Sequence, residues 1–373
     1  MISSSVHPGK TKEPANPMNT RDEASRAVRS LSPTEPSDPS AEALAGRRAA
    51  VLHLLDQRGL MEIRGRAAPK LLHGQTTQDI LALDDGAGTF ALQLNRKARL
   101  QAPMVIRRLA SDRMLVELPV ERLEPTFHSF APFAMLDDCE LVDMTASTLL
   151  LHLSGPSSDD VLAACVEGDF VPELPAYHHL SCRCAGVNVM ISPGPETGEK
   201  GWRILVPADG AVAVASRLLE ETDNRLAAQD SWRILTREAG WPEWGLDLDD
   251  TRLVPECNLP WAVSTTKGCY VGQEIVARVR TYGKVNRCLM GLRSTSLLPA
   301  GSLLQTMDGG EAGEVTSSCL SPHLESPIAM AFVRKTCLEP GTRVLAVGDG
   351  GPWEAEVTTL PFVPRRFWCG TCR

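Results

Sequence analysis

Hydrophobic and polar positions follow two different patterns along the chain, and the change falls near residue 284. Before it, strand-like alternation is mixed with the apolar spacing of helices. The expected strands are 60–63, 89–94, 104–108, 141–144, 149–153 and 202–206, and the expected helices are 67–73, 119–130, 211–219 and 227–239. After residue 284, short apolar runs are separated by turn residues such as Gly301, Gly313 and Gly341. The pattern predicts an α+β region followed by a small β-barrel or sandwich.

The two ends of the chain differ from this pattern. Residues 1–44 are rich in Ser, Pro, Thr, Glu and Asp and have few large apolar side chains, so we expect a disordered tail. Order is expected from residue 45, because Ala49, Leu52 and Leu55 fall at helical spacing. The predicted division is a tail (1–44), an α+β region (45–284), a barrel (285–364) and a cysteine-containing tail (365–373).

Composition narrows the classes of protein that fit. The formal charge of −8 over 373 residues argues against nonspecific binding to nucleic acid or to anionic membranes, which both reward clustered Lys and Arg. No apolar run has the length of a membrane span, and the N-terminus lacks the apolar segment of a signal peptide. The 11 cysteines are mostly isolated, which favours reduced thiols. We therefore expect a cytoplasmic protein.

Residues 267–274, KGCYVGQE, are the clearest candidate for a chemical site. They place Cys269 between two glycines, and the Lys267 ammonium two residues away can lower the pKa of that thiol. A cysteine nucleophile usually needs a nearby histidine as base, and no histidine is close in sequence, so a Cys-His hydrolase is disfavoured. A redox-sensitive or cluster-contacting thiol remains. The alternatives are a turn around a buried cysteine and a Lys267 that is solvated or paired with Glu274.

Three segments of the chain carry a family resemblance. Residues 267–274 resemble the signature of the YgfZ family of folate-binding proteins, relatives of the aminomethyltransferase (T-protein) of the glycine cleavage system. Residues 72–80, LHGQTTQDI, and 237–242, REAGWP, with Gly245 and Asp247, resemble two further blocks of that family. The resemblance covers about residues 48–362. It implies a three-lobed fold in which two α+β lobes, discontinuous in sequence, and a C-terminal antiparallel β-barrel surround an opening that can hold a folate.

The resemblance also assigns roles to residues. It implies that Glu238 contacts the pterin, where a carboxylate can accept two parallel hydrogen bonds. Sequence alone favours an ion pair of Glu238 with a neighbouring arginine instead. Tryptophans 202, 232, 241, 244 and 261 are expected to border the folate pocket or to belong to the core, and Trp261 is the one chosen for the pocket wall. Further candidates for cofactor binding are Tyr270, Gln273 and Glu274.

One segment departs from the transferase pattern. Where the aminomethyltransferases carry a pair of aspartates, this chain has Ala102 and Pro103, which cannot act as general acid or base. The prediction is that folate binding survives while the transferase chemistry is lost.

The cysteine pairs do not predict a metal site. Cys182 and Cys184 alternate on an expected strand, where a core or edge position is favoured. Cys369 and Cys372 supply only half of a tetrahedral site, which leaves a redox pair, a metal or cluster contact and no function as alternatives. The function implied by the resemblance is tetrahydrofolate-dependent assistance in assembling or repairing four-iron clusters, with iron–sulfur client proteins or cluster-assembly factors as partners. The alternatives are a folate-dependent one-carbon transferase, acting on an aminomethyl donor or on tRNA, and a folate-binding module without chemistry.

Overall fold

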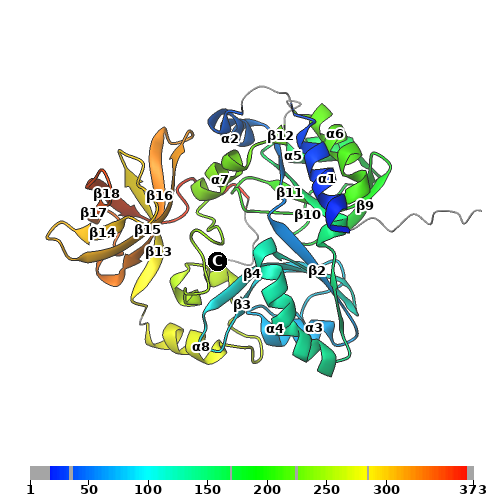
Figure 1. The fold of residues 1–373 in the computed structure, drawn as a ribbon, viewed down its shortest axis with the longest axis horizontal. Helices are drawn as coiled ribbons and strands as arrows, with labels where there is room; N and C mark the ends of the chain where they lie inside the picture. Colours follow the sequence, from blue (N-terminus) through cyan, green and yellow to red (C-terminus); the bar gives the residue numbers. More distant parts are fainter. Residues whose placement is uncertain (1–16, 33–36, 169, 223–225, 284, 368–373) are drawn as a thin grey trace, which may run out of the picture.

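The computed structural model describes residues 17–32, 37–168, 170–222, 226–283 and 285–367. Two open sheets and one closed barrel form three parts around a central region (Figure 1). No helix in these ranges combines the length and the apolar character that crossing a lipid bilayer requires.

The first part is built on a seven-stranded sheet. Its strand order is β12 (Leu226–Ala227), β1 (Val51–Leu54), β7 (Thr148–Ser154), β11 (Gly201–Pro207), β10 (Val187–Pro193), β9 (Leu180–Cys184) and β8 (Val166–Glu167). Helices α1 (Pro17–Arg29), α5 (Ser158–Cys165) and α6 (Ala211–Glu220) share an apolar core with this sheet. Helices α2 (Pro39–Arg48) and α7 (Gln229–Glu238) pack against β1 in a second cluster.

The second part is a five-stranded sheet inserted between β1 and β7. Its strand order is β3 (Gly88–Leu94), β4 (Leu100–Ala110), β5 (Arg113–Pro119), β2 (Arg58–Arg64) and β6 (Glu140–Asp143). Helices α3 (Ala68–Gln75) and α4 (Leu123–Leu136) share one core with it. Its other face packs against the largely irregular segment 241–272 and α8 (Gln273–Tyr282). The first part, built on the seven-stranded sheet, is therefore discontinuous in sequence, as the resemblance implies.

The third part is a closed antiparallel barrel. Its six strands follow the order β13 (Arg287–Ser294), β16 (Ser326–Arg334), β15 (Glu311–Ser321), β14 (Leu303–Thr306), β17 (Arg343–Val347) and β18 (Trp353–Thr358). Closure leaves no free sheet edge, and the interior is filled by small and branched apolar side chains. The fold class predicted from sequence, α+β with a C-terminal antiparallel barrel, is confirmed.

Two expectations for the N-terminal region need correction. Helix α1 and the first part of α2 lie inside the segment expected to be disordered, and Val28 of α1 is fully buried against the seven-stranded sheet. Residues 1–16 and 33–36 of that segment lie outside the described residues. The helix expected after residue 45 is instead the end of α2 followed by strand β1. The four residues of β1, which include His53, are all buried, so the strand shows no alternation of apolar and polar positions to tell it from a helix.

A buried cluster of charges joins the two sheets. Glu117 of β5 accepts hydrogen bonds from Arg107 of β4 at 3.2 Å, from Arg58 of β2 at 3.0 Å and from Arg203 of β11. Arg203 also pairs with Glu196, which follows β10. Burial alone would raise the pKa of Glu117, but the three guanidinium groups outweigh it and hold that pKa far below its usual range.

Acid should weaken this junction. The lowered pKa means that Glu117 contributes its full stabilisation above the unfolded pKa of about 4.5 and loses it as the pH falls further. We expect the free energy of unfolding, measured by urea titration from pH 7 to pH 3, to decrease below about pH 4.5. Glu117→Gln should cost about 3 to 5 kcal/mol at pH 7 and flatten that decrease. Glu354→Gln, in an exposed pair with Arg343, is the control, and an equal effect of the two variants would contradict the prediction.

Candidate functional site

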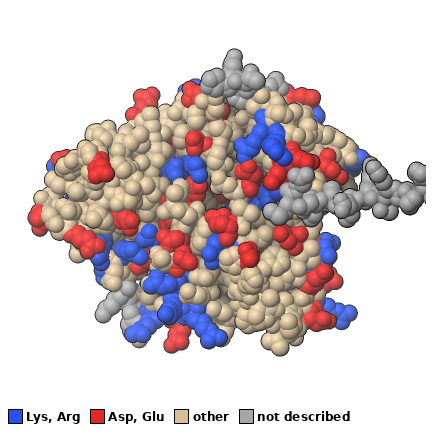
Figure 2. Space-filling view, viewed as in Figure 1, with Lys and Arg blue, Asp and Glu red and all other residues tan. Residues whose placement is uncertain are grey.

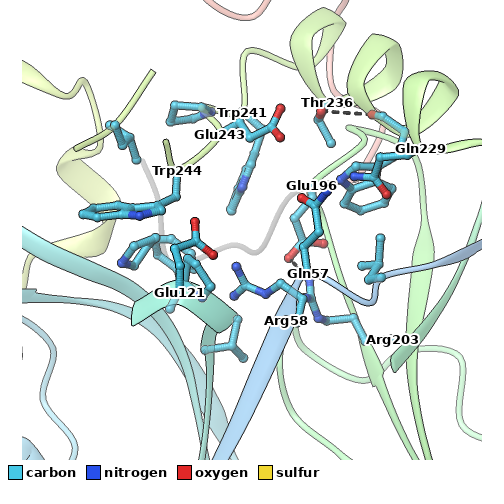
Figure 3. A pocket seen from close by; sticks show the side chains of 18 of the residues that line it. Gln57, Arg58, Glu121, Glu196, Arg203, Gln229, Thr236, Trp241, Glu243 and Trp244 are labelled. Atoms are coloured by element: carbon cyan, nitrogen blue, oxygen red, sulfur yellow. Dashed lines mark hydrogen bonds and ion pairs between the residues drawn. The ribbon is translucent and has the colours of Figure 1, made fainter. Parts of the chain in front are cut away.

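The central cleft lies between the two sheets and the segment 241–248 (Figure 3). It encloses about 900 Å³ of empty space, part of it open to solvent. Its lining combines two groups of side chains. The aromatic group is Phe90, Trp232, Trp241 and Trp244, and the charged group is Arg58, Arg203, Glu121, Glu196 and Glu243. A flat ligand with both polar and charged groups fits such a lining.

The aromatic side of the cleft is a packed cluster. The ring of Trp241 lies edge-on to Phe90, with ring centres 5.3 Å apart. Trp261, predicted for the pocket wall, is not among the lining residues and packs against both rings, with centres 4.9 Å from each. Trp244 has the guanidinium of Arg122 5.2 Å from its ring centre. The cluster holds Trp241 in place and presents aromatic surface to a ligand.

The opposite side of the cleft is the charged junction of the two sheets. Arg203 and Glu196 line it, and Glu196 Oε2 lies 3.5 Å from Nε2 of the buried His152. Burial lowers the pKa of His152, so its imidazole is neutral near pH 7. Trp232 covers His152, with ring centres 4.7 Å apart, and separates it from the cleft.

Strand β4 places Ala102 and Pro103 on opposite faces. Ala102 is fully buried in the core shared with α3 and α4, whereas Pro103 lines the cleft. This follows from the alternation of side chains along a strand. Neither position supplies an ionisable group to the cleft, so its carboxylates come from Glu121, Glu196 and Glu243.

Glu238 lies in a joint and not in the cleft. Its side chain is fully buried, and its Oε2 accepts from Nε of Arg47 at 2.9 Å and lies 2.8 Å from Nη2 of the same guanidinium. Its Oε1 accepts from the hydroxyl of Ser321 on barrel strand β15 at 2.6 Å. Both oxygens are therefore occupied by partners within the protein, and Glu238 does not line the cleft. The structure corrects the expected pterin contact, because this carboxylate joins α2, α7 and the barrel.

Asp247 makes a second joint from the same sequence block. Its Oδ1 accepts from the hydroxyls of Thr316 and Ser317 on β15, at 2.5 and 2.7 Å. Its Oδ2 accepts from the backbone N–H of Glu243 at 2.9 Å. Burial raises the pKa of Asp247. The block that resembles the family's Arg-x-Glu-x-Gly-x-Pro segment thus fixes the barrel beside the cleft.

Lys267 links two of the three resembling segments. Its buried ammonium donates to the backbone carbonyls of His73, Thr76 and Gln78, at 2.7 Å for Thr76 and 2.9 Å for Gln78. It also lies 4.9 Å from the ring centre of Tyr270. Burial lowers the pKa of Lys267 to about 8. These contacts assign Lys267 a structural role that neither the thiol-activating nor the Glu274-paired interpretation anticipates.

The rest of the 267–274 motif is divided between the surface and the core. Cys269 is exposed as a free thiol, and Tyr270 packs into the core behind the five-stranded sheet. Gln273 and Glu274 open α8 and border a shallow hollow together with Arg96 and Arg278. No residue of the motif lines the central cleft. The motif and the cleft are therefore two separate sites.

Cys182, Cys184 and Trp202 belong to the core of the first part of the molecule. Cys182 and Cys184 pack with the core of the seven-stranded sheet, and burial raises the pKa of each thiol to about 11. Trp202 is fully buried and donates to Asp159 at 2.8 Å. The described residues contain no group of three or more His, Cys, Asp or Glu side chains that could hold a metal ion. Cys369 and Cys372 lie outside the described residues.

Comparison with known proteins identifies the class to which this fold and cleft belong. Residues 36–267 match the GCVT N-terminal domain, and residues 287–364 match the glycine cleavage T-protein C-terminal barrel domain. The chain belongs to the glycine cleavage T-protein family.

Similar sequences and a solved structure support this family assignment. The chain is 26% identical over 330 residues to the aminomethyltransferase of Chlorobaculum tepidum, a match that covers 87% of this chain and 90% of the relative. It is 29% identical over 332 residues to that of Pelodictyon phaeoclathratiforme, with 87% and 90% covered. The crystal structure of glycine cleavage system aminomethyltransferase T from Bartonella henselae superposes with a TM-score of 0.82 at 25% identity, over 90% of this chain and 92% of that one.

The contacts of Glu238 should contribute measurably to the free energy of unfolding. Glu238→Ala leaves the buried Arg47 with Glu199, 3.2 Å away, as its remaining counter-charge, and we expect the free energy of unfolding to fall by about 3 to 5 kcal/mol. Glu311→Ala removes a carboxylate from an exposed pair with Arg334 and should cost at most about 1 kcal/mol. Urea unfolding of both variants is the measurement. An unchanged stability of Glu238→Ala would show that the carboxylate is not structural.

Proposed function

We propose that this protein binds a reduced folate in the central cleft and acts as a folate-dependent one-carbon transferase. The observation that carries the proposal is the combined lining of the cleft, with an aromatic wall on one side and carboxylates and guanidinium groups around it. Membership of the glycine cleavage T-protein family, and relatives named aminomethyltransferase, support the same ligand and reaction class.

The cleft offers what a pterin requires. A pterin is a flat heteroaromatic ring that can lie against Trp241 and Trp244, and its amidine-like edge donates two hydrogen bonds to one carboxylate. Since Glu238 is held in the joint, that carboxylate must be one that lines the cleft, Glu121, Glu196 or Glu243. Glu121 is exposed, whereas Glu243 pairs with Arg233 at 3.2 Å and Glu196 pairs with Arg203. Of the three, Glu121 is the one for which the described contacts include no ion pair.

The same three carboxylates bear on the transfer chemistry. With Ala102 in the core and Pro103 on the cleft wall, the acid pair of the transferases has no counterpart at this place. A general acid or base for one-carbon transfer therefore has to come from a carboxylate elsewhere in the lining.

Folate binding can be tested at the aromatic wall. Trp244→Ala should weaken tetrahydrofolate binding about two- to tenfold, since a lost aromatic contact costs roughly 0.5 to 1.5 kcal/mol beyond the area buried, and Trp244→Phe should recover part of it. Calorimetric titration measures both. Turnover is then assayed as ammonia released from an aminomethyl-loaded lipoyl carrier with tetrahydrofolate, where we expect a measurable rate. Binding without turnover would leave a folate-binding module, and absence of binding would refute the proposal.

A role in iron–sulfur cluster assembly is the second candidate, and Cys269 is the observation that favours it. The thiol is exposed in a loop that Lys267 fixes to the end of α3, and the motif resembles the YgfZ signature. In this interpretation the partners are proteins that carry or assemble four-iron clusters. The comparisons give this candidate no support beyond the shared fold.

The two candidates predict different behaviour of Cys269→Ser. Serine is nearly isosteric but stays protonated near neutral pH and is a poor ligand for soft metals. If the transferase proposal is correct, the variant keeps folate affinity and turnover within about twofold, because Cys269 is outside the cleft. If cluster assembly is correct, it loses rescue of four-iron enzymes in a deletion strain at matched expression. A loss of turnover with intact folding would contradict the separation of the two sites.

A further inference from the structure

Arg58 joins the buried charge cluster to the cleft. It lies at the start of β2, its Nε donates to Glu117 at 3.0 Å, and about a fifth of its side chain (21%) is exposed. Figure 3 shows its guanidinium end pointing into the cleft. In the described structure its two terminal nitrogens have no hydrogen-bond partner within the protein. Four N–H donors in a flat fork therefore face the ligand space.

The charges behind Arg58 do not cancel. The cluster contains Arg58, Arg107 and Arg203 against Glu117 and Glu196, which leaves one formal positive charge. The adjacent His53 and His152 add no charge near pH 7, because burial lowers the pKa of each, that of His53 to about 3. The cluster therefore carries one unbalanced positive charge at the position where it meets the cleft.

The carboxylates across the cleft do not supply that charge. Glu243 pairs with Arg233 at 3.2 Å and with Arg237 at 3.7 Å. Glu121 is exposed and makes no ion pair with Arg58 among the described contacts. A buried positive excess with free donors favours a ligand carboxylate, which a guanidinium binds through two parallel hydrogen bonds.

We propose that Arg58 binds a carboxylate of the molecule that occupies the cleft. The inference rests on the proposed function and deepens it, because a folate carries its carboxylates on the glutamyl end and none on the pterin. It sets the orientation of the ligand, with the glutamyl end at Arg58 and the pterin against Trp241 and Trp244. The amidine-like edge of a pterin at Arg58 would bring donors against donors.

The test separates the two ends of a folate. Three probes are titrated calorimetrically into the full chain: tetrahydrofolate, p-aminobenzoylglutamate, which has the glutamyl end alone, and 6-methyltetrahydropterin, which has the ring and no carboxylate. Arg58→Met should weaken the first two about ten- to a hundredfold and leave the third unchanged. Arg58→Lys keeps the positive charge but lacks the forked N–H donors of a guanidinium, and should give a smaller loss of affinity. Arg64→Met, on the same strand and paired with Glu62 at 2.8 Å, is the matched control and should change no affinity.

Each outcome decides between the proposals. Equal loss of all three probes in Arg58→Met, with a lowered unfolding midpoint, would assign Arg58 a structural role and overturn the inference. Unchanged affinity for the glutamyl probes would overturn it as well while leaving folate binding intact. Failure of the unaltered protein to bind any of the probes would refute the proposed function itself.

Discussion

The contact of one carboxylate, Glu117, with three arginines is the constraint on which the arrangement of the two sheets depends. A buried guanidinium without a counter-charge costs several kcal/mol, so Arg107, Arg203 and Arg58 can occupy the interior only if Glu117 is also there. Arg58, Arg107 and Glu117 come from one sheet and Arg203 from the other. The cluster therefore fixes the distance between the sheets, and the floor of the cleft follows from it.

Buried carboxylates also hold the barrel, but they bind mainly hydroxyl and backbone groups in place of arginines. Glu238 and Asp247 each bind hydroxyl groups of β15, and the backbone carbonyl of Glu238 accepts from the N–H groups of Phe362 and Val363 after the last strand. Hydroxyl donors need less desolvation than charged ones, and the one arginine involved, Arg47, comes from α2. On the outer surface, Figure 2 shows Lys and Arg side chains interspersed with Asp and Glu. One set of buried polar contacts thus holds the two sheets together, and a second set holds the barrel beside the cleft.

The sequence predicts the parts of this structure that depend on local pattern. The strands of the second sheet and the barrel alternate or are bounded by turn residues, so their positions follow from periodicity. Strand β1 and helix α2 do not follow, because β1 is buried on both faces and the residues that α2 buries are small or charged: Glu42, Ala43, Gly46 and Arg47. The motif residues were found by resemblance, but their roles depend on partners far along the chain. Arg47 lies 191 positions from Glu238, and Thr76 lies 191 positions from Lys267.

The cleft itself was only partly predictable. Trp241 and Trp244 were among the expected tryptophans, whereas Arg58, Glu121 and Glu196 were not singled out. A signal did exist in Arg107 and Glu117, charged residues inside otherwise apolar strands, since such residues are buried only when they are paired. Which charges pair cannot be read from one strand. It depends on how two sheets meet.

The alternation at Ala102 and Pro103 has a consequence for how this family can diversify. Position 103 faces the cleft and position 102 faces the core, so the two neighbours are under separate selection. The wall of the cleft can change its chemistry by a substitution at one position while the packing behind it is untouched. A family built on such a strand can gain or lose an acid in its binding site in a single evolutionary step without rebuilding its fold.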